Sequence, residues 1–264
     1  MNIGVIIIGD EILSGKRRDG HLPKAIELLG ARGLSLSWAR YVGDDRRLIT
    51  EALAYAFAGG DLVFSFGGIG ATPDDHTRQC AAAALGLPLA LHPQARALIE
   101  ERMQDVAREQ GVPFEPDRPD NVHRLNMGMF PQGARIIPNP YNKIPGFSLA
   151  DVHFVPGFPV MAWPMLEWVL DTHYAHLHGG QRQVERSVIV LGAMEATLTP
   201  LMEEVEARHP GIKVFSLPSV DHPQWGRHIE LGVKGRDGTE AAYQALRAGL
   251  EVHGCQFGPE MVRP

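Results

Sequence analysis

The chain has 264 residues, of which 44% are hydrophobic, and a formal net charge of −6. This length suits one large domain or two modest domains, and the apolar fraction is that of a globular protein with a buried core. The mildly negative charge lacks the electrostatic attraction that drives non-specific binding to nucleic acid, so a small-molecule or protein partner is expected.

The first part of the chain alternates strand-like and helix-like segments. Ile3 to Ile8 is an unbroken aliphatic run, the kind of strand that is buried on both faces of a parallel sheet. Further strands are predicted at residues 34–41, 62–66, 134–137 and 152–155, and helices at 22–31, 46–57, 75–85, 94–109 and 161–176. Because parallel strands need crossover helices on both faces, residues 1–178 are predicted to form a three-layer αβα domain with a mostly parallel sheet.

Two later regions depart from this pattern. Gly111 to Pro145 is rich in proline, asparagine and glycine, and such a long irregular stretch in a compact chain is either disordered or functional. Beyond it, strands are predicted at 184–191, 213–217, 228–234 and near Gln256, and helices at 198–208 and 239–253. The order βαββαβ is the ferredoxin-like signature, so residues 182–264 are predicted to form a small α+β ferredoxin-like domain.

Cysteine content and the N-terminus bear on location. Cys80 and Cys255 stand far apart in no CxxC pattern, which is typical of a reducing compartment and argues against a zinc ribbon. Asp10 ends the first apolar run early and no basic segment precedes that run, so no signal peptide is expected. No apolar stretch approaches the roughly 18–20 residues that a membrane span requires. We therefore expect a cytoplasmic protein without a membrane partner.

The most informative segment is DLVFSFGGIGATPDDHT, residues 61–77. Its strand delivers Gly67, Gly68 and Gly70 to the carboxyl edge of the sheet, where open α/β folds bind their ligands. Glycines there let a ligand approach the backbone closely. The segment is not the dinucleotide fingerprint, whose third glycine would fall on Pro73. The spacing after the first strand likewise excludes a P-loop, because Gly9 and Gly15 are one residue too far apart.

Acidic residues follow three successive strands of the predicted sheet. They are Asp10 and Glu11, then Asp44 and Asp45, then Asp74 and Asp75. Carboxyl ends of parallel strands share one edge, so these acids are expected to converge on one crevice. Structural alternatives remain open for each pair. Either Asp44 or Asp45 would cap the helix that begins at Arg46, and Thr72 to Asp75 fit the first positions of a helix closed by a capping box.

An acidic crevice needs positive charge before it holds a phosphorylated ligand, because carboxylate and phosphate repel each other. A divalent cation or basic neighbours would supply that charge. The basic side chains available nearby are Lys16, Arg17, Arg18 and Lys143.

Four segments, in order, resemble a known family. They are GDEILSG at 9–15, VGDD at 42–45, GGIGATPDDHT at 67–77 and VPGFPVMAWPM at 155–165. They are similar to the molybdopterin-binding domain of the competence/damage-inducible protein A family, and this resemblance covers residues 1 to about 175. Residues from about 182 to 258 resemble the small domain that follows it in that family. The amidase domain of longer members has no counterpart in this sequence, so amidase activity is not expected.

The resemblance implies roles for particular residues. Those on the phosphate or pterin side of the pocket would be Gly67, Gly68, Gly70, Thr72 and Asp75, with Asp44 as the second acidic position and Gly9, Asp10 and Glu11 in the first loop. Asn139 and Gly146 match a family loop written N-x-x-G-T-A-P-G, which reads NPYNKIPG here. The family also usually has Asn-Thr-Asn or Asp-Thr-Asn where this chain has Asp19, Gly20 and His21. Both changes place larger or charged groups near the ligand.

Three functions stay open at this point. The first is binding of a phosphate-bearing pterin or nucleotide, a molybdopterin-type ligand, by the first-loop and glycine-loop residues together with Asp74, Asn139, Lys143 and Gly146. The second is a pyrophosphatase for ADP-ribose-class substrates, in which Asp44 and Asp75 are the catalytic acids and hold Mg²⁺ or another divalent cation. The third is a non-catalytic regulatory module. The resemblance also implies a homo-oligomer.

Overall fold

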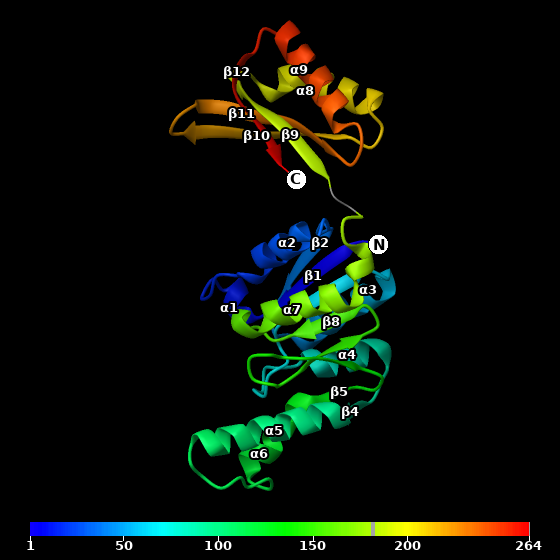
Figure 1. Ribbon diagram of the computed structural model, residues 1–264, viewed down its shortest axis with the longest axis vertical. Coiled ribbons are helices and arrows are strands. Elements are labelled where there is room, and N and C mark those ends of the chain that lie inside the picture. Colours follow the sequence, from blue (N-terminus) through cyan, green and yellow to red (C-terminus); the bar gives the residue numbers. More distant parts are fainter. Residues whose placement is uncertain (181–182, 264) are drawn as a thin grey trace. The chain divides into compact units, whose positions relative to one another are not determined.

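A six-stranded sheet lies at the centre of the first of two units, Met1–His178 and Gly179–Pro264 (Figure 1). The structure is a computed structural model that describes residues 1–180 and 183–263. The limits predicted for the second domain, residues 182 and 264, fall outside the described residues.

The central sheet has the order β2-β1-β3-β8-β7-β6. Its strands are β1 (Ile3–Ile8), β2 (Trp38–Val42), β3 (Leu62–Phe66), β6 (Arg135–Ile137), β7 (Gly146–Leu149) and β8 (Val152–Val155). The pairs β1–β2, β1–β3 and β3–β8 are parallel, whereas β7 pairs antiparallel with both β8 and β6. Every residue of β1 and β3 is buried, which agrees with their largely apolar sequences without polar alternation. The prediction of a mostly parallel sheet is confirmed.

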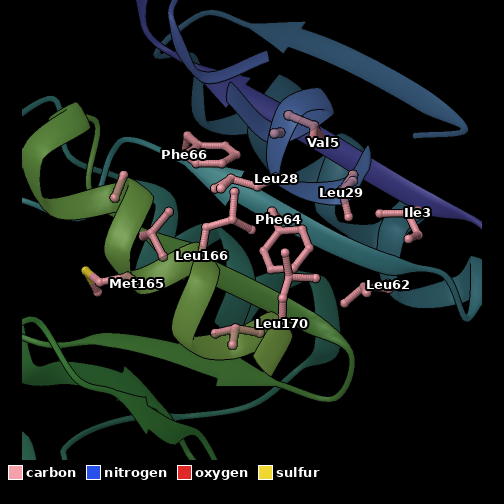
Figure 2. Packing of buried hydrophobic residues seen from close by; sticks show 14 of the residues in the cluster. Ile3, Val5, Leu28, Leu29, Leu62, Phe64, Phe66, Met165, Leu166 and Leu170 are labelled. Atoms are coloured by element: carbon pink, nitrogen blue, oxygen red, sulfur yellow. The ribbon is translucent and has the colours of Figure 1, made fainter. Parts of the chain in front are cut away.

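Helices cover both faces of this sheet. On one face α2 (His21–Ala31) and α7 (Pro159–His173) pack Leu28 and Leu166 around Phe64, as Figure 2 shows. On the other face α3 (Arg46–Gly59) and α4 (Thr77–Leu85) share a second core with strand residues. The predicted three layers are therefore present.

The chain leaves this sheet between α4 and β6. This excursion contains β4 (Leu89–Leu91), α5 (Pro93–Glu109), α6 (Pro119–Arg124), the 3-10 helix η1 (Leu125–Gly128) and β5 (Met129–Pro131). Much of the stretch that we expected to be irregular therefore has short elements. The helix α1 (Asp10–Leu13) and the strand β7 were also missed, since four residues are too few to show a hydrophobic period.

The N-terminus predicted for α4 is corrected by the structure. The capping-box interpretation would make Thr72 the N-cap of a helix that begins at Pro73, but α4 begins at Thr77 with His76 as its N-cap. The Thr77 N–H donates to the carbonyl of Gly68 at 3.0 Å, so a contact with the preceding loop sets the start of the helix. Asp75 lies in a turn before it. Its Oδ2 accepts from the backbone N–H of Thr72 at 2.9 Å and from the Thr72 hydroxyl at 2.6 Å.

The second unit has the order βαββαβ that the sequence predicts. Its elements are β9 (Val184–Leu191), α8 (Glu195–Arg208), β10 (Lys213–His222), β11 (Gly226–Gly235), α9 (Thr239–Val252) and β12 (Gln256–Arg263). The sheet order β10-β11-β9-β12, antiparallel throughout, is the ferredoxin-like arrangement. Both helices share one core with the sheet, around Val190, Leu231 and Leu246. In neither unit does a described helix have the length and apolarity needed to cross a membrane.

Candidate functional site

A cavity of about 600 Å³ opens at the carboxyl edge of the central sheet. Its walls are built by the segments that follow β1, β2 and β3, by the loop at 139–145 and by the turn at 156–158 before α7. The predicted site residues in its lining are Gly9, Glu11, Asp44, Gly67, Gly68, Gly70, Thr72, Asp74, Asp75 and Asn139. Asp10, Lys143 and Gly146 do not belong to that lining. The structure thus gathers residues from these five segments, together with Met127, around one space.

The glycine loop after β3 has its carbonyl groups held by the start of α4. The Thr77 hydroxyl donates to the carbonyl of Gly67 at 3.1 Å, and the Thr77 N–H donates to that of Gly68. The Arg78 guanidinium donates to the carbonyls of Ile69 and Gly70. Gly67 and Gly68 have φ values of +97° and +68°, a conformation that favours glycine. The loop carbonyls are therefore engaged on the protein side.

The amide groups of the same loop are left without protein partners. Within the residues that the structure describes, the N–H groups of Gly68, Ile69 and Gly70 donate to no acceptor. Successive free backbone amides in such a turn form a concave site at which an anion binds. Free amides beside a cavity are therefore the feature of this site best suited to a phosphate.

Arg78 was missed by the sequence reasoning, which treats an arginine in a helix as solvated. Its residue is only 3% exposed, and burial lowers the pKa of its guanidinium while the charge of Asp75 opposes that shift. No described residue accepts from its Nε. No local pattern in the sequence signals this burial, since the partners of Arg78 are backbone carbonyls of the preceding loop.

The acids at the cavity have different tasks. Asp45 is the N-cap of α3 and accepts from the N–H of Leu48 at 2.9 Å, which leaves Asp44 free of capping. Burial raises the pKa of Asp44; the N–H bond from Asp10 opposes this shift, and the charges of Asp10, Glu11 and Asp74 add to it. Asp44 is thus a carboxylate in a field of other carboxylates, where a cation would be stabilised.

Positive charge at the cavity comes from one side chain of the described lining, that of Arg17. Lys143, predicted as a ligand-binding residue, points elsewhere: its ammonium donates to Glu101 at 2.6 Å and to Asp105 at 2.5 Å, both on α5. Lys143 has a φ of +66°. It ties the loop at 139–145 to α5 and acts on the cavity only through that loop.

Asn139 and Gly146 shape the cavity wall. The buried Asn139 donates from Nδ2 to Asn142 Oδ1 at 2.8 Å and to the carbonyl of Ile144 at 2.9 Å, and its Oδ1 accepts from the N–H of Tyr141. Its polar atoms are therefore committed to the loop. Gly146 lies in β7, where a Cβ atom would collide with the carbonyl of Phe154. Its role is close packing of β7 on β8.

Further lining residues carry no local signal in the sequence. They are Met127, Asn142, Ile144, Phe158 and Met161, together with prolines and backbone of the same segments. Met127 reaches the cavity because the excursion folds back, with His123 Nε2 lying 2.9 Å from the carbonyl of Ala71. Met127, Asn142 and Ile144 come from the region marked as disordered or functional, and Phe158 and Met161 come from the segment at 155–165 that resembles the family.

The donor set fits a divalent cation that arrives with a phosphate. Among the described residues no three His, Cys, Asp or Glu side chains are arranged to hold a metal ion by themselves. Mg²⁺ is commonly held by one or two carboxylates, with waters and substrate phosphates completing its shell. The unpaired carboxylate oxygen of Asp44, with Glu11 and Asp74 in the same lining, offers that kind of partial site.

A cavity with a glycine loop at the carboxyl edge of a mostly parallel sheet defines an α/β small-molecule-binding protein. Residues 4–176 match the family described as a probable molybdopterin binding domain, and the chain belongs to this family. The resemblance inferred from the four sequence segments is thereby confirmed.

Relatives extend this similarity into the second unit. The chain is 34% identical over 271 residues to a CinA-like protein of Anaeromyxobacter dehalogenans strain 2CP-1, across 98% of this chain and 61% of that relative. A protein of Pyrobaculum calidifontis is 29% identical over 248 residues, 91% of each chain. A crystal structure of a protein CinA with unknown function from Thermoplasma acidophilum shares 28% identity at a TM-score of 0.55, covering 65% of this chain and 98% of that one. The chain thus spans 61% of the length of the first of these relatives.

Proposed function

We propose that the cavity binds a phosphate-bearing pterin or nucleotide, a ligand of the molybdopterin type. The observation that carries the proposal is the glycine loop, whose carbonyls are held by Thr77 and Arg78 while its amides beside the cavity lack acceptors. A phosphate oxygen accepts from such amides without reorganisation of the loop. Membership of the molybdopterin-binding family supports the same class of ligand.

The size and charge of the cavity support this ligand class. Small-molecule sites commonly enclose about 300–1,000 Å³, and this cavity encloses about 600 Å³. Arg17 supplies one positive charge to the phosphate, and Mg²⁺ held against Asp44 screens the remaining repulsion between carboxylates and ligand. We therefore expect a diphosphate ligand to bind more tightly with magnesium than without it.

Calorimetric titration with molybdopterin and with ADP-ribose, each with and without Mg²⁺, tests the proposal. At least one ligand should bind, and Asp44→Asn should remove the magnesium dependence. The amide oxygen of asparagine still accepts from the N–H of Asp10, so this variant removes the charge and keeps the local hydrogen bond. Absence of binding by both ligands with the wild-type protein would refute the proposal.

Hydrolysis of an ADP-ribose-class diphosphate is a second candidate, favoured by the raised pKa of Asp44 among other carboxylates. A bound divalent cation would polarise a phosphoryl oxygen and activate water. Asp75 offers only its Oδ1 to such a site, since its Oδ2 is occupied by Thr72. Magnesium-dependent release of AMP that falls at least a hundredfold in Asp44→Asn would establish this activity. Binding without AMP release would indicate a binding protein. Absence of binding with every ligand would favour the non-catalytic regulatory module.

A further inference from the structure

We propose that Phe158 and Asn142 recognise the planar heterocycle of the ligand. The ring of Phe158 packs against the face of the heterocycle, and the side-chain amide of Asn142 donates to an acceptor on its edge. This inference rests on the proposed function and deepens it, because it assigns the part of the ligand that is not phosphate to one wall of the same cavity.

Phe158 is an aromatic side chain with an unused face. It precedes the first turn of α7 as its N-cap residue, lines the cavity and is 56% exposed. No described aromatic ring stacks on it. Flat rings of purines and pterins stack on aromatic side chains, which removes apolar surface of both partners from water. An open aromatic face at a cavity wall therefore suits a planar ring.

The position of Phe158 links this wall to the phosphate site. Its neighbour Gly157 packs on the glycine loop, where a Cβ atom at Gly157 would lie 3.5 Å from the Cα of Gly67. The carbonyl of Phe158 accepts from the N–H of Met161, so the first turn of α7 places both apolar side chains in the lining. When the phosphate of a ligand contacts the loop amides, the group attached to that phosphate thus lies beside Phe158.

Asn142 supplies a donor that lacks a strong protein partner. Its Oδ1 accepts from the N–H of Ile144 at 3.1 Å and from Asn139 at 2.8 Å, which sets the orientation of the amide. Its Nδ2 donates to Met161 Sδ at 3.3 Å, and a thioether sulfur is a weak acceptor. A ring nitrogen or carbonyl oxygen of a heterocycle is a stronger acceptor and would replace the sulfur at no cost to the loop.

The test separates ring recognition from phosphate binding with matched ligands. AMP and ribose 5-phosphate share the ribose phosphate and differ in the adenine ring. GMP covers the pterin case, because guanine and pterin share a 2-amino-4-oxopyrimidine ring. Titration calorimetry in the presence of Mg²⁺ should show at least one nucleotide binding roughly tenfold more tightly than ribose 5-phosphate, the effect of one stacked base.

Variants then locate the effect. Phe158→Ala should abolish the preference for the nucleotide and leave the affinity for ribose 5-phosphate unchanged. Val160→Ala is the matched control, since Val160 lies in the same turn, is 53% exposed and is not among the lining residues. Asn142→Asp keeps the oxygen that Ile144 and Asn139 bind but replaces the donor with an acceptor, so it should reduce the preference several-fold.

The outcomes are distinguishable. Equal affinity of the wild-type protein for nucleotides and ribose 5-phosphate, or a preference that survives in Phe158→Ala, would overturn the ring-recognition site and leave the proposed function standing. Failure of the wild-type protein to bind any of these ligands, molybdopterin or ADP-ribose would overturn the proposed function, and this site with it.

Discussion

Asp10 and Asp44 exchange hydrogen bonds across the ends of two neighbouring strands. The N–H of Asp10 donates to Oδ2 of Asp44 at 2.9 Å, and the N–H of Asp44 donates to Oδ1 of Asp10 at 3.1 Å. Gly43 makes room for this exchange, because a Cβ atom there would lie 2.5 Å from Oδ1 of Asp10. The acids that follow β1 and β2 therefore tie the two strand ends together and give the cavity edge its negative charge.

Removing this tie should destabilise the first unit. Asp10→Ala leaves the N–H of Asp44 without its acceptor and should lower the free energy of unfolding by about 1 kcal/mol. Asp10→Asn retains an acceptor and serves as the control. Urea denaturation of both variants measures the difference, and identical midpoints would show that the side-chain acceptor contributes nothing to stability.

Gly68 and Gly86 allow a paired test of the glycine loop. Both have φ near +65°, at +68° and +64°, but a Cβ atom would collide with the Thr77 hydroxyl at Gly68 and meets no atom within 4 Å at Gly86. Alanine at either position should lower the free energy of unfolding by about 1 kcal/mol, because a residue with a Cβ atom disfavours the left-handed backbone conformation. Gly68→Ala should cost at least about 1 kcal/mol more in urea unfolding, because Thr77 must move. Gly68→Ala should also lose ligand binding, whereas Gly86→Ala should retain it. Ligand binding retained in both variants would show that the glycine loop is not part of the site.

Arg78 should be essential for the shape of the loop. Arg78→Ala leaves the buried carbonyls of Ile69 and Gly70 without donors and should cost about 2–4 kcal/mol of stability. Urea unfolding measures this loss. Arg47→Ala is the control, since the exposed ion pair of Arg47 with Glu51 contributes no more than about 0.5 kcal/mol. Equal losses in the two variants would contradict a role for Arg78 beneath the loop.

His153 should make the stability of the first unit depend on pH. Its Nδ1 lies 2.7 Å from the Ser148 hydroxyl and its Nε2 lies 2.8 Å from the Tyr174 oxygen, while the Tyr174 hydroxyl donates to Asp151. The Tyr174 oxygen must then accept from Nε2–H. Because burial keeps the imidazole neutral, Nδ1 accepts from the Ser148 hydroxyl. Burial lowers the pKa of His153 to about 3.

The sign of the pH effect follows from that lowered pKa. Histidine in the unfolded chain takes up a proton near pH 6.5, before the buried imidazole does. The contribution of His153 to the free energy of unfolding is therefore fully present above about pH 7. It falls by up to about 1.4 kcal/mol per pH unit as the pH decreases toward 3. Burial also lowers the pKa of His21, which adds an effect of the same sign. Urea unfolding at pH 7.5 and 5.5 measures the slope, and His153→Gln should flatten it; an unchanged slope would mean that His153 does not titrate in this way.

Local patterns in the sequence were sufficient for the main architecture. The apolar runs of β1 and β3, without polar alternation, predicted buried strands of a parallel sheet, and the order of elements after residue 183 matched a ferredoxin-like unit. The strand order also brought the acids and glycines to one edge, because carboxyl ends of parallel strands coincide. These features depend on periodicity and on chain connectivity, which a sequence displays directly.

The start of α4 shows where such reasoning ends. Thr72, Pro73 and the following acids have the local chemistry of a helix N-terminus, yet the helix begins at Thr77. Bonds from Thr77 and Arg78 to the loop carbonyls outweigh the local capping preference, which is worth about 1 kcal/mol. Lys143 is a similar case, since its two acidic partners on α5 draw it away from the cavity.

The sequence by itself determined the parallel strands of the central sheet, the layers, the ferredoxin-like order and the group of glycines and acids at the sheet edge, all of which follow from residue spacing along the chain. Only the tertiary structure decided which side chains face the cavity: it buried Arg78 beneath the loop, tied Asp10 to Asp44, committed Asn139 to its own loop and left Phe158 open. The reason is physical. Asp10 and Asp44 lie 34 residues apart in the chain and meet only because β1 and β2 pair. The bonds of Arg78 to the loop carbonyls and of Asn139 within its own loop span fewer residues, but they depend on turn geometry that no residue spacing specifies.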